Sequence, residues 1–454
     1  MPDVHLQQEK RYRVDVQASE APLVLDLAPP RTLGTFDQLT LWANLGVTLF
    51  GPVTAAFVLA PTGTPMSLAA AFSAVGVGVL VGSAILGLAA VPGARSGAPA
   101  MVLMRGLFGR RGSAVPTLLN ILQNIGWATF EVVVIAEAAS RLTDERLRPL
   151  WVVLAGAAAT TMAVRPLGSV RVLRKLVVWL VLAASVYLLV SLLGQPMPGS
   201  TEGGWDGWML AVDAALAAGG VSFAPLAADY SRHSRSSGAA FTGAFVGYGA
   251  ASAFYLVLGV LAFASIVDVG GDVIAALLAV PAGALALLVL TVDEVDQAYA
   301  NVYSTTMSVQ NLLPRLDRRV VSVCIGVTST LLALVLDIAG YQNFLFLLGS
   351  VFVPMFAALI VDFFVVSRGG WDLSATARTR ATPIVASLLG FVSYQLINPG
   401  YVDAWATPWI ALRHALGFTP PPWMGASFTS FAVAALAMAV LGGVQRRVRA
   451  SRTR

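Results

Sequence analysis

The sequence predicts an all-α membrane protein with twelve transmembrane helices. Of the 454 residues, 57% are hydrophobic and only 12% are charged, and the mean hydropathy is +0.76. A soluble domain carries about 25% charged residues. The apolar residues recur in runs of about twenty, the length that a helix needs to cross a bilayer. The one cysteine, Cys324, lies inside such a run, so no disulfide framework is expected.

Twelve apolar spans follow a polar segment punctuated by prolines. This segment, residues 1–35, lacks the apolar core of a signal peptide and predicts a cytoplasmic tail. The spans cover residues 36–60, 66–91, 114–140, 149–165, 171–194, 207–230, 238–266, 280–306, 320–338, 341–366, 381–397 and 424–444. The segments between them are rich in glycine, proline and arginine, as turns between helices should be.

Basic residues are distributed unevenly between the two sides of the predicted membrane. With the amino terminus in the cytoplasm, 25 of the 29 lysines and arginines fall on the cytoplasmic side, including those of the basic tail 446–454. The four on the outer side are Arg141, Arg146, Arg148 and Arg413. Because cytoplasmic loops are enriched in basic residues, we expect a multi-pass protein of the cell (inner) membrane with both termini in the cytoplasm. The net charge of +5 reflects this topology and predicts no nucleic-acid partner.

Two of the spans contain helix-breaking residues near their middles. The first span reads Thr48-Leu49-Phe50-Gly51-Pro52, and the sixth reads Gly219-Gly220-Val221-Ser222-Phe223-Ala224-Pro225. An opened backbone persists at membrane depth only where protein or a water-filled cavity satisfies it. Ordinary kinking is the alternative for either helix alone. Breaks at corresponding places in two halves indicate a transporter with inverted repeats and a binding site at the breaks.

Acidic residues inside two spans support a cation-linked site. Glu131 lies in the third span, and Asp293, Glu294 and Asp296 lie in the eighth. Each acid at a helix centre costs about 2.5–3.5 kcal/mol on insertion, and neither span contains a basic residue to neutralise it. These acids must therefore bind a cation, carry a proton or face water.

Trp127 and Glu131 are four residues apart and so share one stripe of the third helix. An indole ring offers a flat surface for stacking a heterocycle, and a carboxylate can accept two parallel hydrogen bonds from an amino-bearing ring edge. Each residue also has an ordinary alternative. Trp127 could serve in packing or at the membrane interface, and Glu131 could be a protonated acid bonded to a neighbouring helix.

Several segments together resemble the nucleobase:cation symporter-1 family, which includes cytosine, purine and hydantoin permeases. They occur in a fixed order along the chain: Gly93-Ala94-Arg95-Ser96-Gly97, Leu118-Leu119-Asn120 with Ile125-Gly126-Trp127, Ala228-Asp229-Tyr230-Ser231-Arg232, Asn301-Val302-Tyr303-Ser304, and Asn343-Phe344-Leu345 through Asp362-Phe363-Phe364. The resemblance implies a leucine-transporter-like fold with a 5+5 inverted repeat plus two extra helices. The repeats would cover residues 36–194 and 207–366, and the extra helices residues 380–445.

The resemblance also implies a substrate site between helices one, three, six and eight. Trp127 matches the family's stacking aromatic, and Glu131 stands where some relatives have an amide, which favours a donor-rich substrate. The family has a second aromatic residue on helix six that stacks on the other face of the substrate ring. Phe223 would be this residue, or Gly220 occupies its position and the pocket has only one stacking face. The predicted substrate-binding residues are Trp127, Glu131, Gly220, Ser222, Phe223 and Asn301.

The predicted cation-coupling residues are Asp296, Asp293, Gly46 and Leu49. In sodium-coupled relatives, helix-one carbonyls and helix-eight hydroxyls hold the ion, but Val295 and Asp296 offer no hydroxyl here. Asp296 could instead supply an oxygen ligand to sodium or carry a proton.

These features favour a secondary transporter over other classes of protein. The two lysines, Lys10 and Lys175, do not form a phosphate-binding loop, and the three histidines do not form a metalloprotease motif, so neither an ATP-driven pump nor an enzyme is expected. We expect import of cytosine, a purine or hydroxymethylpyrimidine in symport with Na+ or H+, by alternating access and without a cofactor. A cation channel and a non-transporting sensor are the alternatives.

Overall fold

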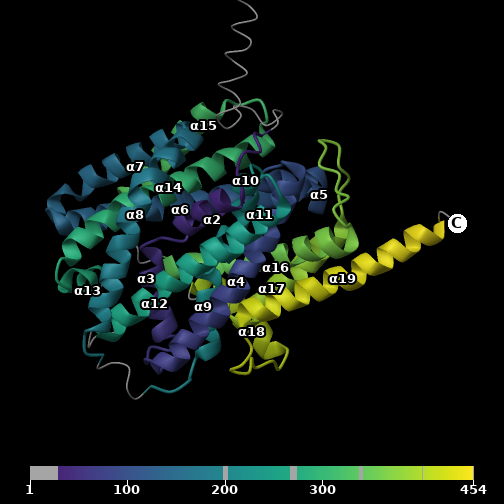
Figure 1. Cartoon of the computed structure of the whole chain (residues 1–454). Coiled ribbons are helices and arrows are strands. Elements are labelled where there is room, and N and C mark those ends of the chain that lie inside the picture. The colour runs from purple at the N-terminus through teal and green to yellow at the C-terminus, as the bar shows by residue number, and fades with distance from the viewer. Residues whose placement is uncertain (1–28, 198–202, 266–272, 337–340, 401, 453–454) are drawn as a thin grey trace, which may run out of the picture.

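The computed structural model describes residues 29–197, 203–265, 273–336, 341–400 and 402–452. Within these ranges the chain forms a bundle of helices (Figure 1), and its β-type pairing is limited to a bridge between Leu33 and Ser234. Parts of four predicted segments lie outside the described residues: 1–28 of the amino-terminal tail, 266 of the seventh span, 337–338 of the ninth span, and 453–454 of the basic tail.

The first half of the bundle contains the five predicted spans and one additional helix. The elements are α2 (Thr35–Leu45), α3 (Phe50–Leu59), α4 (Leu68–Ser96), α5 (Ala100–Gly112), α6 (Ala114–Leu142), η1 (Glu145–Leu147), α7 (Arg148–Val164) and α8 (Pro166–Leu193). The additional helix, α5, was not predicted because Arg105, Arg110 and Arg111 lower its hydropathy.

The second half begins with α9 and ends with the long helix α19. Its elements are α9 (Trp208–Ala218), η3 (Val221–Leu226), α10 (Ala227–Ser231), α11 (Ser237–Thr242), η4 (Gly243–Tyr248), α12 (Gly249–Ser265), α13 (Val273–Ala279), α14 (Gly283–Leu312), α15 (Arg318–Ala333), α16 (Tyr341–Val361), η6 (Asp362–Val366), α17 (Ala381–Ile397), α18 (Asp403–Ala415) and α19 (Ala426–Arg452). In Figure 1, α19 extends beyond the bundle toward the carboxyl end.

Both predicted helix breaks are present. The first span consists of α2 and α3, which are bent by 65° across residues 46–49. In the sixth span, α9 ends at Ala218 with Gly219 as its C-cap, and η3 follows, with Gly220 at a φ of +146°. A Cβ atom at Gly220 would lie 2.8 Å from the carbonyl oxygen of Gly82 in α4, so this break packs too closely for a side chain.

Each of the twelve predicted ranges contains helical structure, but length and composition alone do not confirm a count of twelve. By those criteria, seven helices of the described residues can cross a membrane, or eight if the bent pair α2–α3 is one span. The long helix α14 carries three acids in its middle, and α15 and α17 have only 16 and 17 residues. The all-helical fold was therefore predicted correctly, whereas the exact number of spans stays a prediction.

Helix α14 positions the site because it packs against α6, α7 and α8. On the other side of the bundle, α2 packs against η4, and α3 packs against α12. The acid-bearing faces of α6 and α14 therefore meet beside the break between α2 and α3.

The last residues before α2 are paired with the residues that follow the carboxyl end of the sixth span. The backbone N–H of Leu33 donates to the carbonyl of His233 at 3.0 Å, and that of Arg235 donates to the carbonyl of Leu33 at 2.8 Å. The segment just ahead of the first helix, predicted as part of a tail, is thus attached to the loop after α10.

Candidate functional site

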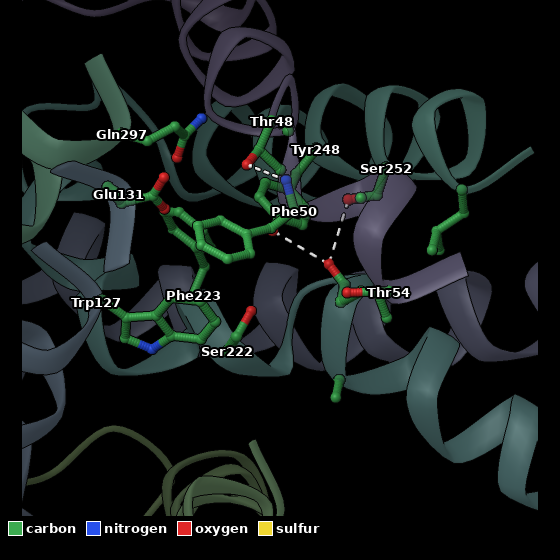
Figure 2. A pocket seen from close by; sticks show the side chains of 15 residues that line it. Thr48, Phe50, Thr54, Trp127, Glu131, Ser222, Phe223, Tyr248, Ser252 and Gln297 are labelled. Atoms are coloured by element: carbon green, nitrogen blue, oxygen red, sulfur yellow. Dashed lines mark hydrogen bonds between the residues drawn. The ribbon is translucent and has the colours of Figure 1, made fainter. Parts of the chain in front are cut away.

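A cavity lies between the two helix breaks and α6. At Gly46, where the first break begins, the packing leaves no room for a side chain: a Cβ atom there would lie 2.7 Å from that of Ala251. Figure 2 shows the polar and aromatic side chains that converge on the cavity. Its lining comprises Gly46, Thr48, Phe50, Gly51, Thr54, Trp127, Glu131, Ala217, Ala218, Ser222, Phe223, Tyr248, Ser252, Leu256 and Gln297.

Four aromatic side chains line this cavity in two pairs. The rings of Phe50 and Trp127 meet edge to face, with centroids 5.9 Å apart and an interplanar angle of 83°. The rings of Phe223 and Tyr248 are tilted by 49° at 5.1 Å. These pairs come from α3, α6, η3 and η4, so the cavity is lined by aromatic rings of both broken spans.

The carboxyl group of Glu131 is hydrogen-bonded to that of Glu294 on α14. Glu294 also accepts a hydrogen bond from the Thr48 hydroxyl at 2.7 Å and another from the Leu49 backbone N–H at 2.9 Å. Leu49 is the N-cap residue of α3, where a carboxylate is favourable because the backbone N–H groups of the first turn lack helical partners. Glu294 therefore joins the cavity acid Glu131 to the break in the first span.

Gln297 lies one turn from Glu294 and binds the other side of this break. Its Nε2 atom donates to the carbonyl oxygens of Val47 at 2.7 Å and Leu45 at 3.0 Å, and lies 3.4 Å from that of Asn44. These acceptors fix the orientation of the amide, with its nitrogen toward the break. A side chain of α14 thus satisfies backbone carbonyl groups at the end of α2.

Asp296 and Asp293 lie outside the cavity lining. The Oδ2 atom of Asp296 accepts a hydrogen bond of 2.6 Å from Asn44 Nδ2, which attaches α14 to α2. Both acids are buried, at 3% and 1% exposure. Among the described residues, no group of three or more His, Cys, Asp or Glu side chains could hold a metal ion.

The other predicted site residues divide into two groups. Trp127, Glu131, Ser222, Phe223 and Gly46 line the cavity. Gly220, Leu49 and Asn301 do not: Gly220 packs against α4, Leu49 caps α3, and Asn301 donates a hydrogen bond to the carbonyl of Gln297 at 3.1 Å.

Several residues of this site were not among the predicted site residues. Tyr248 and Ser252 come from the seventh span, whose sequence carries no break or acid to mark it. Glu294 was predicted only as one of the acids of the eighth span and not as a site residue. Spacing does mark one further pair, because Glu294 and Gln297 are three residues apart and share a face of α14.

The fold and the site define a multi-pass membrane transporter. The sequence profile of a family of permeases for cytosine/purines, uracil, thiamine and allantoin matches residues 31–384. This match covers well over half of the chain, which belongs to this permease family, nucleobase:cation symporter-1. It is a transporter family, so the expectation of a transporter rather than an enzyme is confirmed.

Individual relatives are distant in sequence but similar over most of the chain. YxlA of Bacillus subtilis (strain 168), which carries the name of a purine-cytosine permease, is 23% identical over 341 residues, or 69% of this chain and 73% of that protein. The closed structure of Mhp1, a nucleobase-cation-symport-1 family transporter with bromovinylhydantoin bound, matches with a TM-score of 0.70 at 18% identity. It covers 94% of this chain and 96% of Mhp1.

More distant structures share the same fold. MhsT in complex with L-phenylalanine matches with a TM-score of 0.54 at 16% identity, covering 88% of this chain and 98% of MhsT. A Na+-coupled sialic acid symporter matches with a TM-score of 0.53 at 13% identity, covering 91% of this chain and 96% of the symporter. The predicted leucine-transporter-like fold is therefore confirmed.

Proposed function

We propose that this protein imports an amino-bearing nucleobase or a related aminopyrimidine in symport with a cation. Cytosine, a purine and hydroxymethylpyrimidine are the candidate substrates. The observation that carries the proposal is the cavity at the two helix breaks, where an indole, other aromatic rings and a carboxyl group converge (Figure 2). A flat heterocycle with hydrogen-bond donors on one edge fits this combination of surfaces.

Stacking on Trp127 supports a planar substrate. This indole is 9% exposed, and its ring is held by the edge-to-face contact with Phe50. Phe223 of the broken sixth span and Tyr248 of the seventh span supply further apolar surface. Apolar walls that exclude water would strengthen the polar contacts made at the edge of the ring.

Glu131 supports an amino group on that edge. Its carboxyl group lines the cavity, and the residue is only 3% exposed. A buried acceptor of this kind costs free energy until a donor reaches it. An amino group on the substrate would supply that donor, whereas a ring carbonyl would place a second acceptor against it.

The transport cycle that we propose is alternating access between the two repeats 36–194 and 207–366. In such cycles the substrate site lies at the discontinuous helices, and the repeats move around it. The excess of basic residues in the predicted cytoplasmic segments supports a topology with both termini in the cytoplasm.

A thermal-shift screen of the purified protein tests the substrate class. Cytosine, adenine and hydroxymethylpyrimidine should raise the unfolding temperature more than uracil or hydantoin, because binding to the native state stabilises it. A shift for hydantoin or uracil without one for any amino-bearing ring would contradict the proposal. The Trp127→Ala variant should lose the shift, whereas Trp179→Ala, which removes a 68%-exposed indole from α8, should keep it.

A further inference from the structure

We propose that the coupled cation is a proton shared by Glu131 and Glu294, and that the Gln297 amide occupies the place in the first helix break where sodium would bind. This inference rests on the proposed symport function. It moves the coupling role from Asp296, which the sequence favoured, to a pair of acids that joins the substrate cavity to the broken helix.

The first observation concerns the backbone carbonyls of the opened first span. In transporters with broken helices, unwound carbonyls are the groups that coordinate sodium or take part in proton coupling. Here the carbonyls of Val47, Leu45 and Asn44 surround one nitrogen atom, Gln297 Nε2. That nitrogen carries two N–H groups with a partial positive charge. It therefore interacts with the carbonyl oxygens that would otherwise be the ligands of a cation.

A sodium ion does not fit this arrangement. Sodium needs several oxygen ligands, and an N–H donor cannot share its carbonyls with a cation at the same point. The nearby hydroxyl of Thr48 already donates to Glu294. Gln297 is only 1% exposed, so it is part of the packed interior and not a surface side chain that moves freely aside.

The second observation is the hydrogen bond between Glu131 and Glu294. Two ionised carboxylates only accept, so a hydrogen bond between them requires one proton on the pair. Glu294 already accepts from Thr48 and Leu49, which makes it the better carboxylate of the two. The proton therefore resides on Glu131, which donates to Glu294.

The titratable neighbours of the pair are carboxyl and phenol groups. The titratable groups near the pair are Asp293 and Asp296 of α14, Tyr248 of η4 and Tyr255 of α12. Among the described residues, no basic side chain forms an ion pair with Glu131 or Glu294. A proton bound between the two carboxyl groups therefore removes the repulsion between two buried negative charges.

This arrangement couples the proton to the substrate. When the pair holds a proton, Glu131 is fixed by Glu294 and its carboxyl group lines the cavity, where it can accept from an amino group. When the proton leaves, two negative charges repel each other and the Glu131 side chain loses this position. Substrate binding and proton binding then favour each other reciprocally, which is the thermodynamic requirement for symport.

The sodium part of the proposal can be tested without a substrate. The unfolding temperature of the purified full-length protein is measured in equal concentrations of sodium chloride and choline chloride. We expect the same value in both salts, because the break already holds an amide. Stabilisation of the wild-type protein specifically by sodium would overturn the proposal. Stabilisation by sodium that appears only in Gln297→Ser, which replaces the amide by a hydroxyl, would support it.

The proton part is tested by the pH dependence of the same unfolding temperature. In the wild type we expect a fall as the pH rises and the pair loses its proton. Glu294→Gln should reduce this component, because the amide donates to the Glu131 carboxylate and no longer repels it. Glu137→Gln, at the exposed outer end of α6, should retain it. A wild-type pH profile in Glu294→Gln would overturn the proposal.

These measurements test the substrate class and the coupling ion separately. If no heterocycle shifts the unfolding temperature, the proposed substrate class fails while the sodium and pH comparisons still report on the coupling site. If a heterocycle binds and sodium also stabilises the wild type, the substrate class stands and the proton proposal fails.

Discussion

Glu131 of α6 and Glu294 of α14 are hydrogen-bonded through their carboxyl groups, 163 positions apart in the sequence. Glu131 faces the cavity, whereas Glu294 binds Thr48 and the N-terminus of α3. One contact therefore connects the wall of the candidate substrate site to the helix break that must rearrange when the transporter changes its access.

Removal of the Trp127 ring should weaken binding of a heterocycle substantially. Stacking of a base on an aromatic side chain contributes about 1–3 kcal/mol, which corresponds to a loss in affinity of roughly fivefold to more than a hundredfold. Isothermal titration of cytosine into Trp127→Ala measures this loss. Trp127→Phe should recover part of the affinity, and an unchanged Kd in Trp127→Ala would remove stacking from the account.

Substitution Glu131→Gln should discriminate between amino-bearing and oxo-bearing rings. A hydrogen bond to a charged or acidic group contributes roughly 1.5–3 kcal/mol. The amide retains an acceptor but can turn its donor toward the substrate, so cytosine should lose at least about tenfold in affinity and uracil much less. Competition binding with both ligands measures the ratio. Equal losses for the two ligands would contradict recognition of an amino edge by Glu131.

The ion pair at the end of the tenth span should be a strong determinant of stability. Asp362 is fully buried and accepts two hydrogen bonds of 2.7 Å from Arg380 and one of 2.6 Å from Trp371 Nε1. Arg380→Met should cost about 3–5 kcal/mol because it leaves a buried carboxylate without its cation. Thermal unfolding measures the loss.

The exposed pair between Arg141 and Glu137 provides the matched control for this prediction. Its side chains are 39% exposed, so Arg141→Met should change stability by no more than about 1 kcal/mol. If Arg380→Met and Arg141→Met lowered the stability equally, the buried Asp362–Arg380 pair would contribute no more to stability than an exposed pair does.

Acidification should destabilise the contact between the amino-terminal segment and the loop after α10. Burial lowers the pKa of His233 from 6.5 to about 4, with a further contribution from Arg232 and an opposing one from the Pro30 carbonyl, which lies 3.0 Å from Nδ1. The unfolded chain therefore binds a proton at a higher pH than the folded chain does. Stability is fully present above about pH 6.5 and falls as the pH is lowered toward 4.

A pH series of unfolding temperatures for the wild type and His233→Gln checks this effect. The variant should show a flatter profile between about pH 6.5 and 4. Identical slopes for both proteins would rule out His233 as the titrating group.

Sequence patterns predicted the helices and their breaks because these depend on local composition. Apolar runs specify membrane spans, and the clusters around Pro52 and Gly220 specify the interruptions, whatever surrounds them. Trp127 and Glu131 could be predicted for the same reason. Their four-residue spacing places both side chains on one stripe of the third helix, and the helix breaks indicate where the cavity lies.

The partners of these residues could not be predicted from spacing alone. Asp293 and Asp296 share a face of α14, and that face was expected to hold the cation. The packing of α14 against α6 instead turns Glu294 and Gln297 toward the break, while Asp296 meets Asn44 of α2. The rotation of a helix about its own axis depends on its neighbours, so tertiary packing decides which of several buried acids meets the site.

Transport into proteoliposomes tests the central claim most directly. Radiolabelled cytosine is offered outside vesicles with an inward proton gradient, an inward sodium gradient, or neither. We predict accumulation above the outside concentration under the proton gradient alone, with exchange but no accumulation in Glu294→Gln. Accumulation driven by sodium without a proton gradient, or undiminished accumulation in Glu294→Gln, would contradict the account.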